Sequence, residues 1–146
     1  MHKHLVPLTL LLAVSIGTAT AGPADEKPYR EGPVTDVSFI RVKDGKLLDY
    51  MKHLNGPYKQ EMEAYKKAGL ITEYRIYQAT PRTPHDANII LTITYPNYAA
   101  FDRTAEFENI TVKVEGSLKA ADKNYADRGP IREVIGSELV RELILK

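Results

Sequence analysis

Residues 47–78 constrain the fold most, because a long amphipathic helix and a strand follow each other there without a break. Apolar side chains recur at steps of three and four, the spacing of one stripe on an α-helix. The stripe consists of Leu47, Met51, Leu54, Tyr58, Met62 and Tyr65, and charged residues fill most of the other positions. The pattern predicts a helix with one buried side.

The dipeptide Gly56-Pro57 lies inside this helix. A proline removes one helical hydrogen bond and clashes with the preceding turn. Because the stripe stays in phase across it, we expect one kinked helix and not two unrelated ones. Gly69 is placed to end the helix. Residues 71–78 then alternate with a period of two and are rich in β-branched and aromatic residues, which predicts a strand.

The first 21 residues have the pattern of a cleaved export signal. An apolar run over residues 5–16 is followed by the small residues Ala19, Thr20 and Ala21, so cleavage is expected before Gly22. The run is too short to span a bilayer as a mature helix. We therefore expect a soluble exported protein, periplasmic or extracellular, without a membrane span. An uncleaved N-terminal anchor is the alternative.

Composition narrows the class of protein further. The 146 residues suit one domain, and the absence of cysteine excludes disulfides even in an exported protein. The chain has 20 Lys and Arg and 19 Asp and Glu, and the signal contains only the base Lys3, so the mature chain is close to neutral. That balance argues against nucleic acid or an anionic membrane surface as the main partner.

The mature chain reads as a flexible leader over residues 22–33 and one domain over residues 34–146. Four strands are predicted at residues 34–42, 71–78, 88–95 and 138–145, the last of which could also be a helix. A short helix capped by Asn97 and a second helical stripe (Val114, Leu118, Ala121 and Tyr125) lie between the last two strands. The resulting β-α-β-β-α-β order predicts an α+β, ferredoxin-like fold with a four-stranded antiparallel sheet.

A homodimer is expected from the third strand. Residues 89–95 carry no charge on either face, so both faces should be covered. In this fold the helices cover one face of the sheet only, and the chain contains no obvious cover for the other. A second copy of the sheet would provide it.

Several stretches add a resemblance to a known family. They are Val42-Lys43-Asp44-Gly45-Lys46, Gly56-Pro57-Tyr58-Lys59, Lys67-Ala68-Gly69-Leu70-Ile71, Leu91-Thr92-Ile93-Thr94-Tyr95, Ala126-Asp127-Arg128-Gly129 and Gly136-Ser137-Glu138-Leu139. With this element order, the chain resembles the dimeric α/β-barrel superfamily, and within it a group of small exported bacterial proteins of unassigned activity. That superfamily includes cofactor-free monooxygenases, lactone isomerases, haem-dependent enzymes and ligand-sensing modules. The resemblance therefore implies a fold and a cavity, and no particular reaction.

No metal or cofactor site is predicted. Only His53 and His85 remain after cleavage, and they do not form a close-spaced ligand pair. His53 is interpreted as a partly exposed helical histidine, with a haem or metal ligand as the alternative. The chain has no cysteine nucleophile, no serine elbow and no phosphate-binding loop.

The best candidate ligand site is on the second strand. Arg75 and Tyr77 share one face of this strand, and Tyr74 and Ile76 share the other. If Tyr74 and Ile76 pack under the long helix, Arg75 and Tyr77 point toward a partner sheet. The hypothesis is a cavity in which Arg75, Tyr77, Tyr58 and His53 bind a carboxylate or an enolate. The alternative is a salt bridge between Arg75 and Glu73 or an acid of the partner.

The sequence thus predicts an exported homodimer of unassigned activity that binds a small ligand in a sheet cavity or acts as a structural module. The alternative function is a cofactor-free, monooxygenase- or isomerase-like enzyme acting on a small aromatic or enolisable substrate. The sequence leaves open whether the protein is an enzyme.

Overall fold

The computed structural model describes residues 26–146, so the predicted export signal lies outside the described residues. The strands are β1 (Tyr29–Val42), β2 (Glu73–Gln78), β3 (Ile89–Tyr95) and β4 (Arg132–Leu145). The helical segments are α2 (Leu47–His53), η1 (Leu54–Tyr58), α3 (Lys59–Lys67), η2 (Tyr98–Asp102), α4 (Thr104–Glu115) and α5 (Leu118–Asp127). No helix within this part of the chain is long and apolar enough to cross a bilayer.

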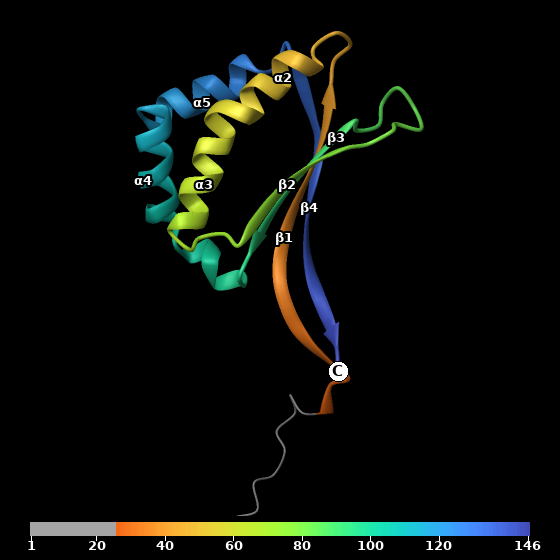
Figure 1. The fold of residues 1–146 in the computed structure, drawn as a ribbon, viewed down its shortest axis with the longest axis vertical. Coiled ribbons are helices and arrows are strands. Elements are labelled where there is room, and N and C mark those ends of the chain that lie inside the picture. Colours follow the sequence, from red (N-terminus) through yellow and green to blue (C-terminus); the bar gives the residue numbers. More distant parts are fainter. Residues whose placement is uncertain (1–25) are drawn as a thin grey trace, which may run out of the picture.

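The four strands form one antiparallel sheet in the order β2-β3-β1-β4. The helices lie on one face of the sheet, and the loop between β2 and β3 projects on the opposite side (Figure 1). This interleaving of two β-α-β halves is the ferredoxin-like arrangement. The predicted α+β fold class is therefore confirmed.

The core lies between the helices and one face of the sheet. One buried cluster joins Ile40, Val42 and Ile89 of the sheet to Tyr50 and Leu54. A second cluster contains Met62, Tyr65, Leu70 and Ile71, with Tyr74, Ile93 and Tyr95 of the sheet packed against it. Alternate strand residues supply this core, because successive side chains of a strand point to opposite faces. Tyr74 and Ile76 belong to the core side, as predicted.

The long helix is kinked at the predicted place. Its middle is a π-helical turn over Leu54–Tyr58, in which Gly56 leaves the helical region with φ −106° and ψ −109°. The proline at position 57 explains the distortion, since it cannot donate the next helical hydrogen bond. Gly69, with φ 67°, ends the helix in the left-handed region that glycine adopts without strain.

The first strand is longer than predicted. The expected leader over residues 22–33 is wrong in its second half, because β1 begins at Tyr29 and its first residues pair with Leu143, Ile144 and Leu145 of β4. The register shifts between Glu31 and Val34, so Gly32 and Pro33 form an irregularity in this ladder. The leader was predicted because residues 22–33 contain three prolines, two glycines and mostly charged residues otherwise. The predicted last strand is confirmed and begins earlier, at Arg132.

The second helical region differs from the prediction in two ways. The stripe from Val114 to Tyr125 is not one helix, because Gly116 with φ 89° separates α4 from α5. Ser117 caps the new helix by accepting a hydrogen bond from the Ala120 N–H at 3.0 Å. The short helix after Asn97 is present as a 3-10 turn, but the Asn97 side chain makes no capping hydrogen bond.

Candidate functional site

The sheet face opposite the helices, called the open face below, is uncharged along its centre. Strands β1 and β3 contribute only apolar or hydroxyl side chains there: Thr35, Val37, Phe39, Ile90, Thr92 and Thr94. Charged side chains occur on the two edge strands, with Glu73 and Arg75 on β2 and Glu138 on β4. No helix or strand among residues 26–146 packs on this face (Figure 1).

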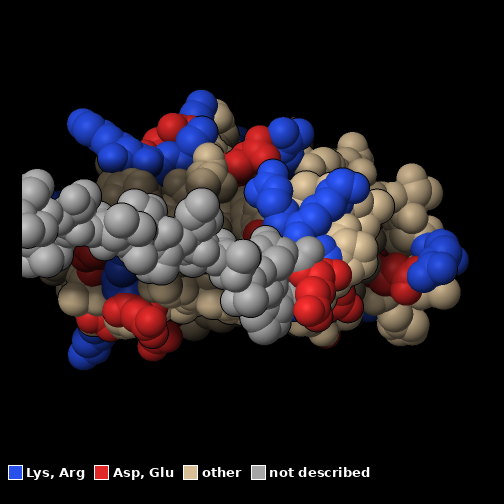
Figure 2. All heavy atoms as spheres, turned by 90° about the horizontal axis from the view of Figure 1, so that it is seen from below, with Lys and Arg blue, Asp and Glu red and all other residues tan. Residues whose placement is uncertain are grey.

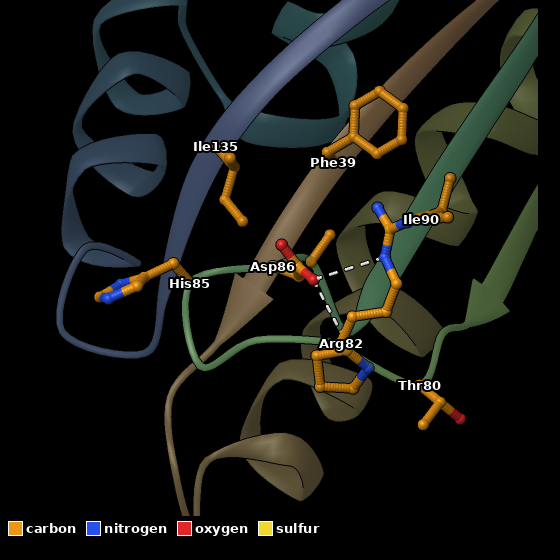
Figure 3. Close-up of a pocket in the computed structure, with 9 residues that line it drawn as sticks. Phe39, Thr80, Arg82, His85, Asp86, Ile90 and Ile135 are labelled. Carbon is orange, nitrogen blue, oxygen red and sulfur yellow. Dashed lines mark hydrogen bonds and ion pairs between the residues drawn. The ribbon is translucent and has the colours of Figure 1, made fainter.

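The open face is hollowed at one end, beside the β2–β3 loop. The hollow has a volume of about 310 Å³, and its floor includes Phe39 of β1, Ile90 of β3 and Ile135 of β4. Arg82 and Asp86 of the loop lie over it and form an ion pair at 3.9 Å, whereas the His85 ring points away from it (Figure 3). An apolar floor with a few polar groups at the rim is the usual composition of a small-molecule site.

Polar contacts hold the loop in place over the hollow. Arg41 of β1 donates to the Pro84 carbonyl at 3.2 Å and forms an ion pair with Glu133 of β4. The Asp86 carboxylate accepts hydrogen bonds from the backbone N–H groups of Thr83 and Arg82, at 2.9 and 3.0 Å. These hydrogen bonds lower the pKa of Asp86 below its ordinary value, and the bond from Thr83 has the largest effect. The rim of the hollow therefore has a defined shape without a ligand.

Two of the predicted site residues, Arg75 and Tyr77, lie on the open face. Tyr77 is the cross-strand partner of Ile90, and Ile90 forms part of the floor of the hollow. Arg75 forms an ion pair with Glu73 at 2.6 Å, and this contact raises the pKa of the guanidinium. The Arg75 side chain is 58% exposed. This pairing is the salt bridge that the sequence offered as the alternative to a ligand.

The other two candidates, Tyr58 and His53, lie on the helix side of the sheet. The Tyr58 hydroxyl is shielded from solvent and has no hydrogen-bond partner within the described residues. Burial raises the pKa of Tyr58 well above its ordinary value, so the hydroxyl keeps its proton. The structure therefore brings the four predicted residues into two separate regions on opposite faces of the sheet. Whether either region binds a ligand stays a prediction.

His53 lies at the end of α2, where its ring stacks on Tyr50 with centroids 6.2 Å apart. It borders a cavity of about 270 Å³ between the helix kink and α5, whose other walls are Pro57, Glu115, Asn124, Asp127 and Arg128. No group of three or more His, Asp or Glu side chains within residues 26–146 could hold a metal ion.

The environment of His53 predicts an acid-sensitive fold. Burial, and next the charge of Arg128, lower the pKa of His53 to about 4. The unfolded chain binds a proton near its ordinary pKa of about 6.5 and the folded chain does not, so stability falls as the pH drops from about 6.5 toward 4. We expect a loss of about 2 kcal/mol in the free energy of unfolding, measured by urea titration at each pH. His53→Gln should flatten this dependence, and an unchanged slope in that variant would contradict the assignment.

A cationic pair beside this cavity was missed by sequence reasoning. Arg132, at the start of β4, is 7% exposed, and its guanidinium lies 4.5 Å from the ring centroid of Tyr125. Arg128 approaches the same ring at 5.4 Å. No sequence signal marks Arg132 as buried, because it stands among the charged residues that join α5 to β4.

Charges elsewhere on the surface are mixed. On the face seen in Figure 2, groups of Lys and Arg side chains lie beside groups of Asp and Glu, and uncharged residues form much of the remainder. This view agrees with the near-neutral composition.

No family model matches the chain, and no curated protein matches it. Among solved structures, HapK from Hahella chejuensis is 14% identical over 75% of this chain and 91% of its own, with a TM-score of 0.46. A dimeric ferredoxin-like protein from an uncultured marine organism is 10% identical over 80% of this chain and 98% of its own, with a TM-score of 0.49. A putative chlorite dismutase is 16% identical over 77% of this chain and 44% of its own, with a TM-score of 0.42. Since these scores are low, the ferredoxin-like assignment rests on the strand order and connectivity.

Proposed function

We propose that this chain is an exported homodimeric binding protein, in which the open faces of two copies meet and enclose a small, mostly apolar ligand. The observation that carries the proposal is the uncharged centre of the open face, which no described helix or strand covers. Export is inferred from the signal pattern of residues 1–21 alone.

The distribution of residues on the open face supports a second copy as the cover. Tyr77, Ile135 and Val140 are 46%, 43% and 43% exposed, which is unfavourable for apolar and aromatic side chains in water. Charges lie on the edge strands and at one end of β1, where Arg41 pairs with Glu133 of β4. An uncharged centre with a polar rim is the usual anatomy of a protein interface. A homodimer can form through this surface alone, because in a two-fold symmetric interface the same patch of each copy contacts the other copy.

The hollow over Phe39, Ile90 and Ile135 supports a ligand at the same interface. Its volume of about 310 Å³ lies near the lower end of small-molecule sites, which span about 300 to 1,000 Å³. In one copy the hollow opens to solvent, and a facing sheet would close it. The Arg82 side chain at its rim is 95% exposed and pairs with Asp86 at 3.9 Å, so a ligand carboxylate would compete with Asp86 for the guanidinium. A small aromatic ligand fits the apolar floor, and an acid group on it would have to displace Asp86 from Arg82.

A thermal-shift screen of small aromatic acids and their neutral amides tests the proposal. A ligand that binds only the folded dimer raises Tm, by about 5 °C at ten times Kd for a domain of this size. Phe39→Ala, which removes part of the floor, should abolish the rise. Leu118→Ala is the matched control, because Leu118 lies on α5 and is 48% exposed. A response that survives Phe39→Ala, or no response to any compound, would contradict the site.

The second candidate is a cofactor-free enzyme, and the unpartnered Tyr58 hydroxyl is the observation that favours it. A buried hydroxyl without a partner costs about 1 to 3 kcal/mol, and an oxygen atom of a substrate would satisfy it. With its pKa raised by burial, Tyr58 would donate a hydrogen bond to a developing enolate and would not act as a base. Product analysis of the compounds in the screen separates the binding protein from the enzyme. Conversion of a compound to a product by the wild type, lost in Tyr58→Phe, would favour the enzyme.

A further inference from the structure

Arg132 is a buried cation without an acidic partner. The Arg132 residue is 7% exposed, and within residues 26–146 no carboxylate oxygen lies at ion-pair distance from its guanidinium. Its neighbours are aromatic: it stacks on Tyr125, and it lies close enough to the buried Tyr50 hydroxyl to offset part of the rise that burial causes in the pKa of Tyr50. These contacts solvate a guanidinium but do not neutralise it. Buried charges in proteins are normally paired with an opposite charge.

Arg128 adds a second positive charge at the same place. It also lacks a carboxylate at ion-pair distance within the described part of the chain. Burial, and next the charge of Arg132, lower the pKa of Arg128. Unlike Arg132, Arg128 borders the 270 Å³ cavity beside His53. The cavity therefore has a guanidinium in its wall, with another close behind it.

The acids in the cavity wall offset only part of this charge. Asp127 forms an ion pair with Lys123 at 2.5 Å, so these two neutralise each other. Glu115 accepts a hydrogen bond from the Asn124 amide at 2.6 Å and is the one remaining acid of the wall. Two guanidiniums against one free carboxylate leave a single positive charge. One monovalent anion would balance it.

The geometry points to a carboxylate-binding site in the cavity between the helix kink and α5, with Arg128 as the binding group and Arg132 as the charge behind it. The guanidinium fork of Arg128 matches a carboxylate, and Arg fits such an anion better than Lys does. Glu115 in the wall disfavours a second negative charge on the ligand. The class of ligand is therefore a small monocarboxylate and not a phosphate dianion. The site lies on the helix side of the sheet and does not depend on the proposed dimer.

The test is a titration of the full chain with sodium propionate at constant ionic strength, followed by the NMR signals of the His53 ring. Saturable shifts of these signals are expected, together with a rise in Tm of about 5 °C at ten times Kd. Inorganic phosphate at the same ionic strength should give neither change. If phosphate saturates the signals more tightly than propionate, or if sodium chloride alone reproduces the shifts, the assignment is overturned.

Three variants locate the effect. Arg128→Met should weaken propionate binding at least tenfold. Arg103→Met is the matched control, because Arg103 precedes α4, is paired with Glu106 at 2.7 Å and borders neither the cavity nor the hollow, and it should leave Kd unchanged. Glu115→Gln removes the opposing acid and should tighten binding severalfold, which keeps the proposal testable even if Arg128→Met does not fold. Unchanged binding in Glu115→Gln, or equal losses in Arg128→Met and Arg103→Met, would contradict the site.

Discussion

Leu54→Ala is expected to lower the free energy of unfolding by about 3 kcal/mol. Leu54 is 1% exposed and belongs to the buried cluster that joins the kinked helix to β1 and β3. Truncation removes its apolar contacts and leaves a cavity at the distorted turn. The turn is held by Pro57, so the surrounding backbone has little freedom to collapse into the space.

Urea unfolding at neutral pH measures this effect. Since domains of this kind are stable by about 5 to 15 kcal/mol, the loss should move the unfolding midpoint clearly. Leu48→Ala provides the matched control, as Leu48 is in the same helical region and is 75% exposed. Its cost should stay within about 0.5 kcal/mol. Similar costs for the two variants would show that the kinked turn does not anchor the core.

Features with a regular period could be predicted from the sequence. The alternation of residues 71–78 gave the core side of β2 correctly. The helical stripe was right for its later members, Leu54, Tyr58, Met62 and Tyr65, which belong to the core clusters or pack against them. It was wrong for Leu47 and Met51, which are 39% and 36% exposed, because α2 buries Tyr50 instead. The kink also follows from local chemistry, because any helical proline removes a hydrogen bond. Together with the element order, these features determine the ferredoxin-like fold.

Features that depend on distant contacts could not be predicted. The first residues of β1 are strand because β4 continues alongside them, although Gly32 and Pro33 locally favour a loop. The break at Gly116 is different, because it is local: a glycine followed by the N-cap residue Ser117 signals a helix end and a new start, and the spacing of the stripe outweighed that signal.

The candidate site was predictable only in part for the same reason. Strand alternation correctly placed Arg75 and Tyr77 on one face of β2. Tyr58 and His53 lie on the other side of the sheet from that pair. Their position depends on how the helix packs on the sheet, which the spacing of residues in the sequence does not show. The burial of Arg132 likewise depends on Tyr50 and Tyr125, which are remote from each other in the sequence.

Val37→Lys is expected to convert the proposed dimer into a monomer. Val37 is in the centre of the open face, on β1, where its cross-strand neighbours are Thr92 and Glu138. In a single copy the lysine would lie in water beside the Glu138 carboxylate, an opposite-charge pair that a sheet tolerates well. In a face-to-face dimer two such lysines would be buried in the same interface. The desolvation cost should weaken association by at least about 1,000-fold, or about 4 kcal/mol.

Light scattering at micromolar concentration, with urea unfolding as a check that the variant still folds, measures this change. Val112→Lys is the matched control, because Val112 lies on α4 on the helix side and is 38% exposed. It should leave the mass of the dimer unaltered. A wild-type chain that is monomeric under these conditions would refute the dimer directly. If the Val37→Lys chain remains dimeric, the interface does not lie on the open face. The hollow at Phe39 would then have no second sheet to close it and would be an ordinary surface depression.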